Sequence, residues 1–136
     1  MKKVTSIAFS VLLFTIASLH SSLAISAEKP VQHLKLSDIT SFKEAKKVFI
    51  ETTAQIRSKT KLDAAELHEI HMITYSLEKA VAYFADNMKA EQKNAARKIA
   101  EVVDLVHLGS ENNRTAETKV YLEEYFKLAE AFTKKL

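Results

Sequence analysis

The sequence predicts an all-α domain, an up-down-up-down four-helix bundle that follows a cleaved signal peptide. Apolar residues recur at three- and four-residue steps in four segments, and the connections between these segments are short. The chain has one glycine and one proline among its 136 residues and no sustained strand pattern, which argues against a sheet. Its length suits one domain rather than two. A three-helix bundle is the alternative, if the first helix packs loosely.

Residues 1–27 have the pattern of a signal peptide. Two lysines give it a positive start, and residues 7–19 (IAFSVLLFTIASL) form an apolar run that is too short to span a bilayer comfortably. Small residues follow, and cleavage fits either after Ala24 or after Ala27. We therefore expect a Sec-type signal, a mature protein that is periplasmic or secreted, and no stable membrane insertion after cleavage. Residues 28–40 are expected to form an extended leader.

The composition narrows the classes of partner and cofactor. Cleavage removes two lysines and no acidic residue, so the net charge falls from +3 to +1. A near-neutral chain of mixed charges lacks the basic footprint of nucleic-acid binding, so we expect no nucleic-acid partner. The absence of cysteine excludes disulfides, thiolate metal sites, iron–sulfur clusters and covalently attached c-type haem. The domain is therefore expected to depend on its helical core for stability.

The bundle domain is predicted to cover residues 41–136. Its first helix is expected to begin at Ser41, because Ser41 and Glu44 have the spacing of a capping box. In such a box the serine oxygen accepts from a free backbone amide, and the glutamate reaches back to the amide of the cap itself. A start at Ser37 or Asp38 is the alternative.

The second helix is predicted from its N-cap, Asp63, to Met88. Its apolar side chains follow one another at alternating steps of three and four residues, the spacing of a seam that packs at a shallow angle against neighbouring helices. The seam consists of Leu67, Ile70, Thr74, Leu77, Val81, Phe84 and Met88. Thr74 is its one polar position.

The third helix is predicted from about residue 90 to Leu108, and the fourth from Thr115 to Lys135. Gly109 follows the last apolar residue of the third helix, where a left-handed C-cap favours a residue without a Cβ atom. The fourth helix is expected to present a broad apolar face, made of Val120, Leu122, Tyr125, Phe126, Leu128, Ala129 and Phe132.

The second helix also carries candidate metal ligands: His68, His71 and Met72. Because residues three and four apart share a helix face, His68 neighbours both His71 and Met72. Two histidines at this spacing can hold one metal ion, and a thioether would favour copper(I) over zinc. On the heptad of the seam, however, His71 flanks the buried face, whereas His68 and Met72 point outward.

A comparison of the second and third helices adds His107 and Glu111. If these helices form an antiparallel hairpin, positions whose numbers sum to about 179 lie opposite each other. His71 and His107 then lie at one level, and His68 lies near Glu111. One end of the bundle is therefore expected to gather these four side chains together with Tyr75.

Three interpretations of this cluster stay open. A copper or zinc site would use His71 and His107, and His68, Met72 or Glu111 would complete it. A b-type haem would take its axial ligands from histidine and methionine or from two histidines. A buried hydrogen-bonded network of the two histidines and a neighbouring tyrosine would instead fix the helix register, and we favour this interpretation.

Motifs of familiar enzymes do not occur in the sequence. The Glu-x-x-His pair of di-iron bundles is absent, and residues 68–71 (HEIH) are one residue short of the H-E-x-x-H zinc-protease motif. We therefore expect a non-enzymatic binding or interaction protein for an unknown protein or small ligand, without a cofactor. The alternative function is the binding of copper, zinc or haem b through His71 and His107.

Two segments carry a family resemblance. Residues 71–78 (HMITYSLE) and 106–111 (VHLGSE) resemble a family of small exported bacterial helical proteins, a domain of unknown function. The likeness covers residues 65–128. It implies a signal peptide and a helical domain, and it implies no established activity or functional residue. In that family a small residue such as alanine usually stands at the position of Gly109.

Overall fold

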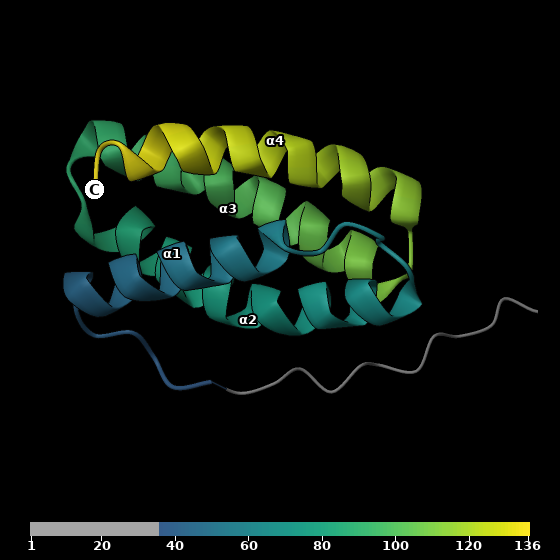
Figure 1. Ribbon diagram of the computed structural model, residues 1–136. Helices are drawn as coiled ribbons and strands as arrows, with labels where there is room; N and C mark the ends of the chain where they lie inside the picture. The colour runs from purple at the N-terminus through teal and green to yellow at the C-terminus, as the bar shows by residue number, and fades with distance from the viewer. Residues whose placement is uncertain (1–35) are drawn as a thin grey trace, which may run out of the picture. The chain divides into compact units, whose positions relative to one another are not determined.

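The computed structural model describes residues 36–136, and within this range the chain folds into four helices and no strand. The helices are α1 (Phe42–Arg57), α2 (Ala64–Asn87), α3 (Ala90–Glu111) and α4 (Thr115–Thr133). Short connections join them, and consecutive helices run side by side in opposite directions (Figure 1). The predicted all-α, up-down-up-down four-helix bundle is confirmed.

Other predictions concern the first residues of the chain. The signal peptide, its cleavage sites and most of the leader lie outside the described residues. Among the residues that are described, none of the helices combines the length and the apolar character that crossing a membrane requires.

The N-terminus of α1 lies where the sequence predicts it. Ser41 is the N-cap, and its Oγ accepts a hydrogen bond of 3.2 Å from the backbone N–H of Glu44. The Glu44 carboxylate accepts from the amide of Thr40 at 3.3 Å, one residue before the amide that a standard capping box would use. The alternative start at Ser37 or Asp38 is therefore wrong.

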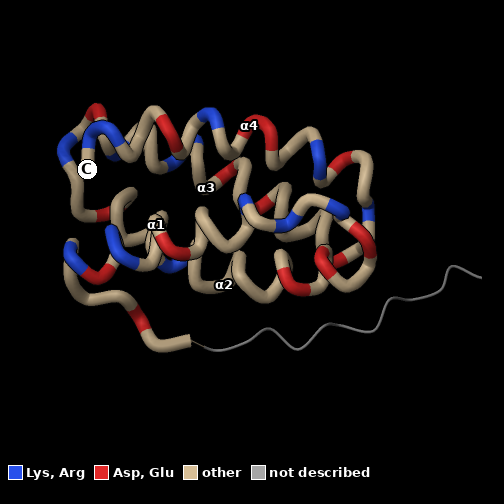
Figure 2. The backbone as a smooth tube through the Cα atoms, in the orientation of Figure 1, with Lys and Arg blue, Asp and Glu red and all other residues tan. Residues whose placement is uncertain are grey.

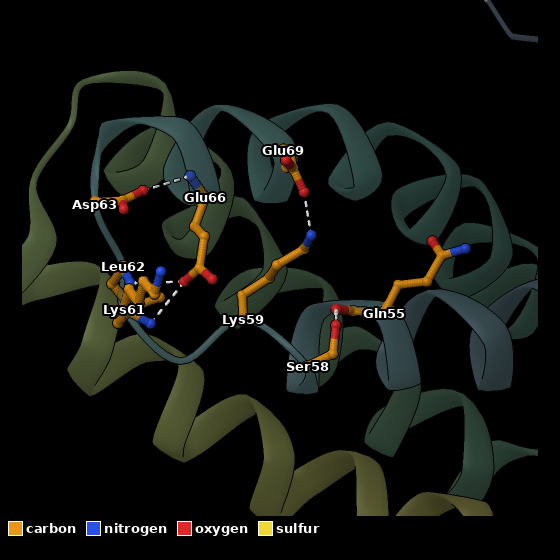
Figure 3. Close-up of polar contacts among 8 residues, drawn as sticks. All are labelled: Gln55, Ser58, Lys59, Lys61, Leu62, Asp63, Glu66 and Glu69. Carbon is orange, nitrogen blue, oxygen red and sulfur yellow. Dashed lines mark hydrogen bonds and ion pairs between the residues drawn. The ribbon is translucent and has the colours of Figure 1, made fainter.

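The connection between α1 and α2 is held by the first turn of α2 (Figure 3). Asp63 is the N-cap, and its Oδ1 accepts from the backbone N–H of Glu66 at 3.0 Å. The Glu66 carboxylate accepts from the amides of Lys61 and Leu62 at 2.7 and 2.8 Å. Leu62 has a φ of 50°, which a branched side chain rarely adopts, so these two bonds help to hold a strained turn.

The seam predicted on α2 faces the core. Six of its seven residues are buried, and Met88 at the helix end is partly buried. Phe49, Phe84 and Phe132, from three different helices, meet edge to face with ring centroids 5.4–5.9 Å apart. Because α1 supplies the fully buried Phe49 to this cluster, α1 is an integral part of the core and the three-helix alternative is wrong.

The end of α3 differs from the prediction. The helix continues to Glu111, so Gly109 lies inside it, and the left-handed residue of the connection is Asn113, with a φ of 53°. A Cβ atom at Gly109 would lie 2.6 Å from Oγ1 of Thr118 on α4. The glycine therefore serves the close approach of two helices, and its prediction as a C-cap was wrong.

The surface of the bundle is charged and mixed. Figure 2 shows Lys and Arg interspersed with Asp and Glu along the helices. Two ion pairs tie the ends of the described chain to the bundle: Lys79 contacts Asp38, and Lys135 lies 2.8 Å from Glu91. In both pairs the hydrogen bond from the ammonium group lowers the pKa of the carboxyl group. Val120, which we expected on the apolar face of α4, is instead 59% exposed.

Candidate functional site

His71, His107 and Glu111 come together where α2 faces α3. One potential ligand atom of each residue lies within 4.8 Å of those of the other two. His71 and His107 are buried residues, with relative exposures of 4% and 7%, and Glu111 is partly buried. Their ring centroids are 4.8 Å apart and their planes cross at 66°. The prediction that His71 and His107 lie at one level is confirmed.

His71 is oriented by residues of its own helix. Its Nε2 lies 3.0 Å from the hydroxyl oxygen of Tyr75, one turn further along α2, and the two rings are 5.1 Å apart. Tyr75 also packs edge to face against the His107 ring at a centroid distance of 5.0 Å. One tyrosine ring therefore touches both histidines, which restricts the rotation of each imidazole.

His107 is oriented from the opposite helix. Its Nδ1 lies 2.5 Å from Oε1 of Glu78 and 3.2 Å from Oγ1 of Thr74. The Thr74 hydroxyl donates its only hydrogen to the carbonyl oxygen of His71, at 2.6 Å. Since a carboxylate and an already donating hydroxyl both act as acceptors here, the His107 Nδ1 must carry the hydrogen. A neutral His107 then has its lone pair on Nε2, the form in which imidazole binds metals.

A hollow of about 480 Å³ lies beside this cluster along α2 and α3. It is lined by Tyr75, Glu78, Asp104, His107 and Leu108. The Glu78 side chain is one-third exposed, so the residue that binds the buried His107 also faces solvent. His107 is the member of the cluster that lines this hollow.

His68 and Met72 are not part of this arrangement. Both side chains are exposed, as the heptad predicts, and the His68 ring centroid lies 6.3 Å from that of His71. They line a different hollow, of about 370 Å³, which includes Lys59 and Glu69 from the α1–α2 region. The residue that meets Glu111 and His107 is thus His71, because His68 is on the outer face of α2.

The donors of the three-residue cluster are near the spacing that a metal ion needs. A tetrahedral ion with bonds of about 2.0–2.2 Å places its ligand atoms roughly 3.4 Å apart. The observed limit of 4.8 Å means that side-chain rotations, mainly of the long and partly exposed Glu111, would complete the site. Ring nitrogens more than about 8 Å apart would have ruled out shared ligation, and His71 and His107 are well inside that limit.

The residues that bind the histidines were only partly foreseen. The His71–Tyr75 bond belongs to the network that we favoured from the sequence, but His107 joins that network through Thr74 and Glu78. Two signals were available. Thr74 is the one polar residue in an apolar seam, and Glu78 lies four residues after it, on the same helix face.

Comparisons with known proteins give a family but no activity. No curated protein and no protein of solved structure matches the chain. A family model, described as a family of unknown function (DUF6746), matches residues 1–134. This agrees with the resemblance to an uncharacterised family. The chain therefore belongs to this family of unknown function, DUF6746.

Proposed function

We propose that the protein is a small exported binding protein, without enzymatic activity, whose ligand is a single zinc or copper ion. One observation supports this proposal above all others: the ligand atoms of His71, His107 and Glu111 lie within 4.8 Å of one another. The three residues come from two helices that pack along much of their length, so the donors are held by the core rather than by loops.

The donor set favours borderline metals. Imidazole nitrogen suits zinc and copper, and a carboxylate oxygen is compatible with both. Met72 lies on the outer face of α2, so a thioether would not complete the site, which favours zinc or copper(II) over copper(I). Three protein ligands leave one position of a tetrahedral ion for water.

Burial favours binding over catalysis. Both histidines are almost entirely buried, so a bound ion would have little surface for a substrate. A buried ion would also join α2 to α3 near one end of the bundle, which would stabilise the fold. Export follows from the expected signal peptide in residues 1–27 and would place the protein in the periplasm or outside the cell.

The haem b alternative has less support. Two imidazole nitrogens on opposite sides of one iron are roughly 4 Å apart, with the ring centres farther apart still. The centroids of His71 and His107 are only 4.8 Å apart, and Tyr75 packs against both rings. A porphyrin between these histidines would require α2 and α3 to separate.

The test is metal binding by the protein purified from an exporting host and stripped with a chelator. We expect zinc or copper(II) to bind with one ion per chain in calorimetry and to raise the melting temperature. At a free metal concentration of 100 times Kd, binding should add about 2.7 kcal/mol to the free energy of unfolding.

Two matched variants locate the site. Glu111→Gln replaces the carboxylate of a partly exposed ligand by a neutral amide, so it should weaken binding. His68→Gln changes an exposed side chain and should leave binding unchanged. If neither metal changes the melting temperature of the natural protein, or if only His68→Gln weakens binding, the proposed site is wrong.

A further inference from the structure

We propose that Glu78 is a positioning residue of the metal site, which holds His107 in the tautomer that presents Nε2 to the ion. The effect on metal affinity rests on the proposed function, but the effect on the tautomer concerns the metal-free protein and can be measured separately. Glu78 is not one of the three potential metal ligands, so its role does not follow from their spacing.

The geometry at Nδ1 supports this role. Glu78 Oε1 is 2.5 Å from the Nδ1 atom of His107, closer than Oγ1 of Thr74. A carboxylate is a stronger acceptor than a hydroxyl, and charge-assisted bonds are roughly twice as strong as neutral ones. Thr74, at 3.2 Å, supplements the bond without being able to replace it. Glu78 is therefore the group that decides where the imidazole hydrogen lies.

The same bond fixes the direction of the ring. Glu78 acts from α2 on a histidine of α3, and the Tyr75 ring packs against the His107 ring edge to face. With Nδ1 directed at Glu78, Nε2 lies on the opposite edge of the imidazole, and in the neutral Nδ1–H form it is the nitrogen that would bind an ion. A carboxylate behind a metal-bound histidine also raises the basicity of the ligand nitrogen, and its removal typically weakens metal binding about 10–100-fold.

The experiment uses three variants of the full exported protein. Glu78→Ala removes the acceptor, and Glu78→Gln keeps a neutral acceptor oxygen at the same length. Asp104→Asn changes a carboxylate that lines the same hollow, and it is the matched control. Nitrogen-15 NMR of the imidazoles in the metal-free protein, at alkaline pH, reports which ring nitrogen of His107 carries the hydrogen. Calorimetry with zinc reports the affinity.

We expect the natural protein and Asp104→Asn to carry the hydrogen on Nδ1. In Glu78→Ala the Nε2–H form should appear, and the zinc affinity should fall about 10–100-fold. Glu78→Gln should restore the Nδ1–H form and recover part of the affinity, a rescue that a merely structural role would not produce. Circular dichroism of each variant checks that the fold is kept.

Three results would overturn the proposal. These are an Nε2–H tautomer in the natural protein, an unchanged tautomer in Glu78→Ala, and a zinc affinity that Glu78→Ala leaves unchanged. Failure of the natural protein to bind zinc or copper would instead contradict the proposed function, and the NMR comparison would still decide whether Glu78 sets the tautomer of His107.

Discussion

The two ends of the bundle are built on different physical principles. At the end where α2 finishes, the rings of Phe49, Phe84 and Phe132 fill the core and no hydrogen bond is needed between them. At the end where α2 begins, the core boundary holds His71 and His107, and each polar atom must have a partner. The apolar end depends on how well side chains fill the core, and the polar end depends on the directions of hydrogen bonds.

This difference affects how each end tolerates substitution. Apolar side chains pack without preferred partners, so similar volumes can replace one another at small cost. A buried polar network has no such tolerance, since the loss of one member leaves another unsatisfied in a medium of low dielectric constant. The apolar end thus tolerates side chains of similar volume, whereas the polar end depends on each hydrogen-bond partner.

The largest expected effect is at the apolar end. Phe84→Ala should lower the free energy of unfolding by about 3–5 kcal/mol, because the substitution leaves a cavity where rings from three helices meet. Urea denaturation measures the change. Val120→Ala, at a position that is 59% exposed, is the control and should cost less than about 0.5 kcal/mol. Equal effects of the two substitutions would show that the core is elsewhere.

Alkaline pH should destabilise the protein through Tyr125. This side chain is fully buried, which raises the pKa of its hydroxyl above the ordinary value of about 10, and it shares a hydrogen bond of 2.6 Å with Thr53. Above about pH 10 the unfolded chain loses this proton while the folded chain keeps it. The stability that is present below that pH should therefore fall by up to about 1.4 kcal/mol per pH unit.

Denaturant midpoints between about pH 9 and pH 11 measure this loss. Tyr125→Phe removes the ionisable group, so the variant should lose less stability over that range than the natural protein does. The same pH dependence in both proteins would assign the loss to other groups.

The third effect concerns the close contact of α3 and α4 at the polar end. Gly109→Ala should gain about 1 kcal/mol in helix propensity but lose about 1–3 kcal/mol through overpacking against Thr118, for a net loss of up to about 2 kcal/mol. Thr118→Ala should reverse the sign, because it removes the Oγ1 atom that the new methyl group would strike. A double-mutant cycle on thermal unfolding measures the coupling, and additive effects would contradict it.

The smallest expected effect is that of Thr74→Val, within the histidine network. The variant keeps the shape of the side chain but loses the hydroxyl that contacts His107 and the His71 carbonyl. Since Glu78 still binds His107, the loss should be about 0.5–1.5 kcal/mol. Thr133→Val removes the hydroxyl of an exposed helix residue at the opposite end and is the control for the free energy of unfolding. A larger loss for the control would show that the polar end is not the more sensitive to loss of a hydroxyl group.

Much of this molecule was determined by local sequence. Ser41 and Asp63 cap helices because their side chains reach amides only three residues away. The seam of α2 can be recognised in the sequence because its apolar spacing matches the turn of a helix. That His71 and His107 lie at the same height along the bundle also followed from their residue numbers, since two antiparallel helices advance equally for each residue. These features depend on neighbours in sequence or on regular geometry.

The tertiary structure decided the rest. Rotation of each helix about its axis chose His71 over His68 as the partner of Glu111 and placed the Glu78 carboxylate on His107. The approach of α3 to α4 gave Gly109 its role. Counting residues fixes how far along a helix a side chain lies, but its direction depends on how all the apolar faces pack together. Because a hydrogen bond depends on direction, the packing of the helices decided which side chains contact the two histidines.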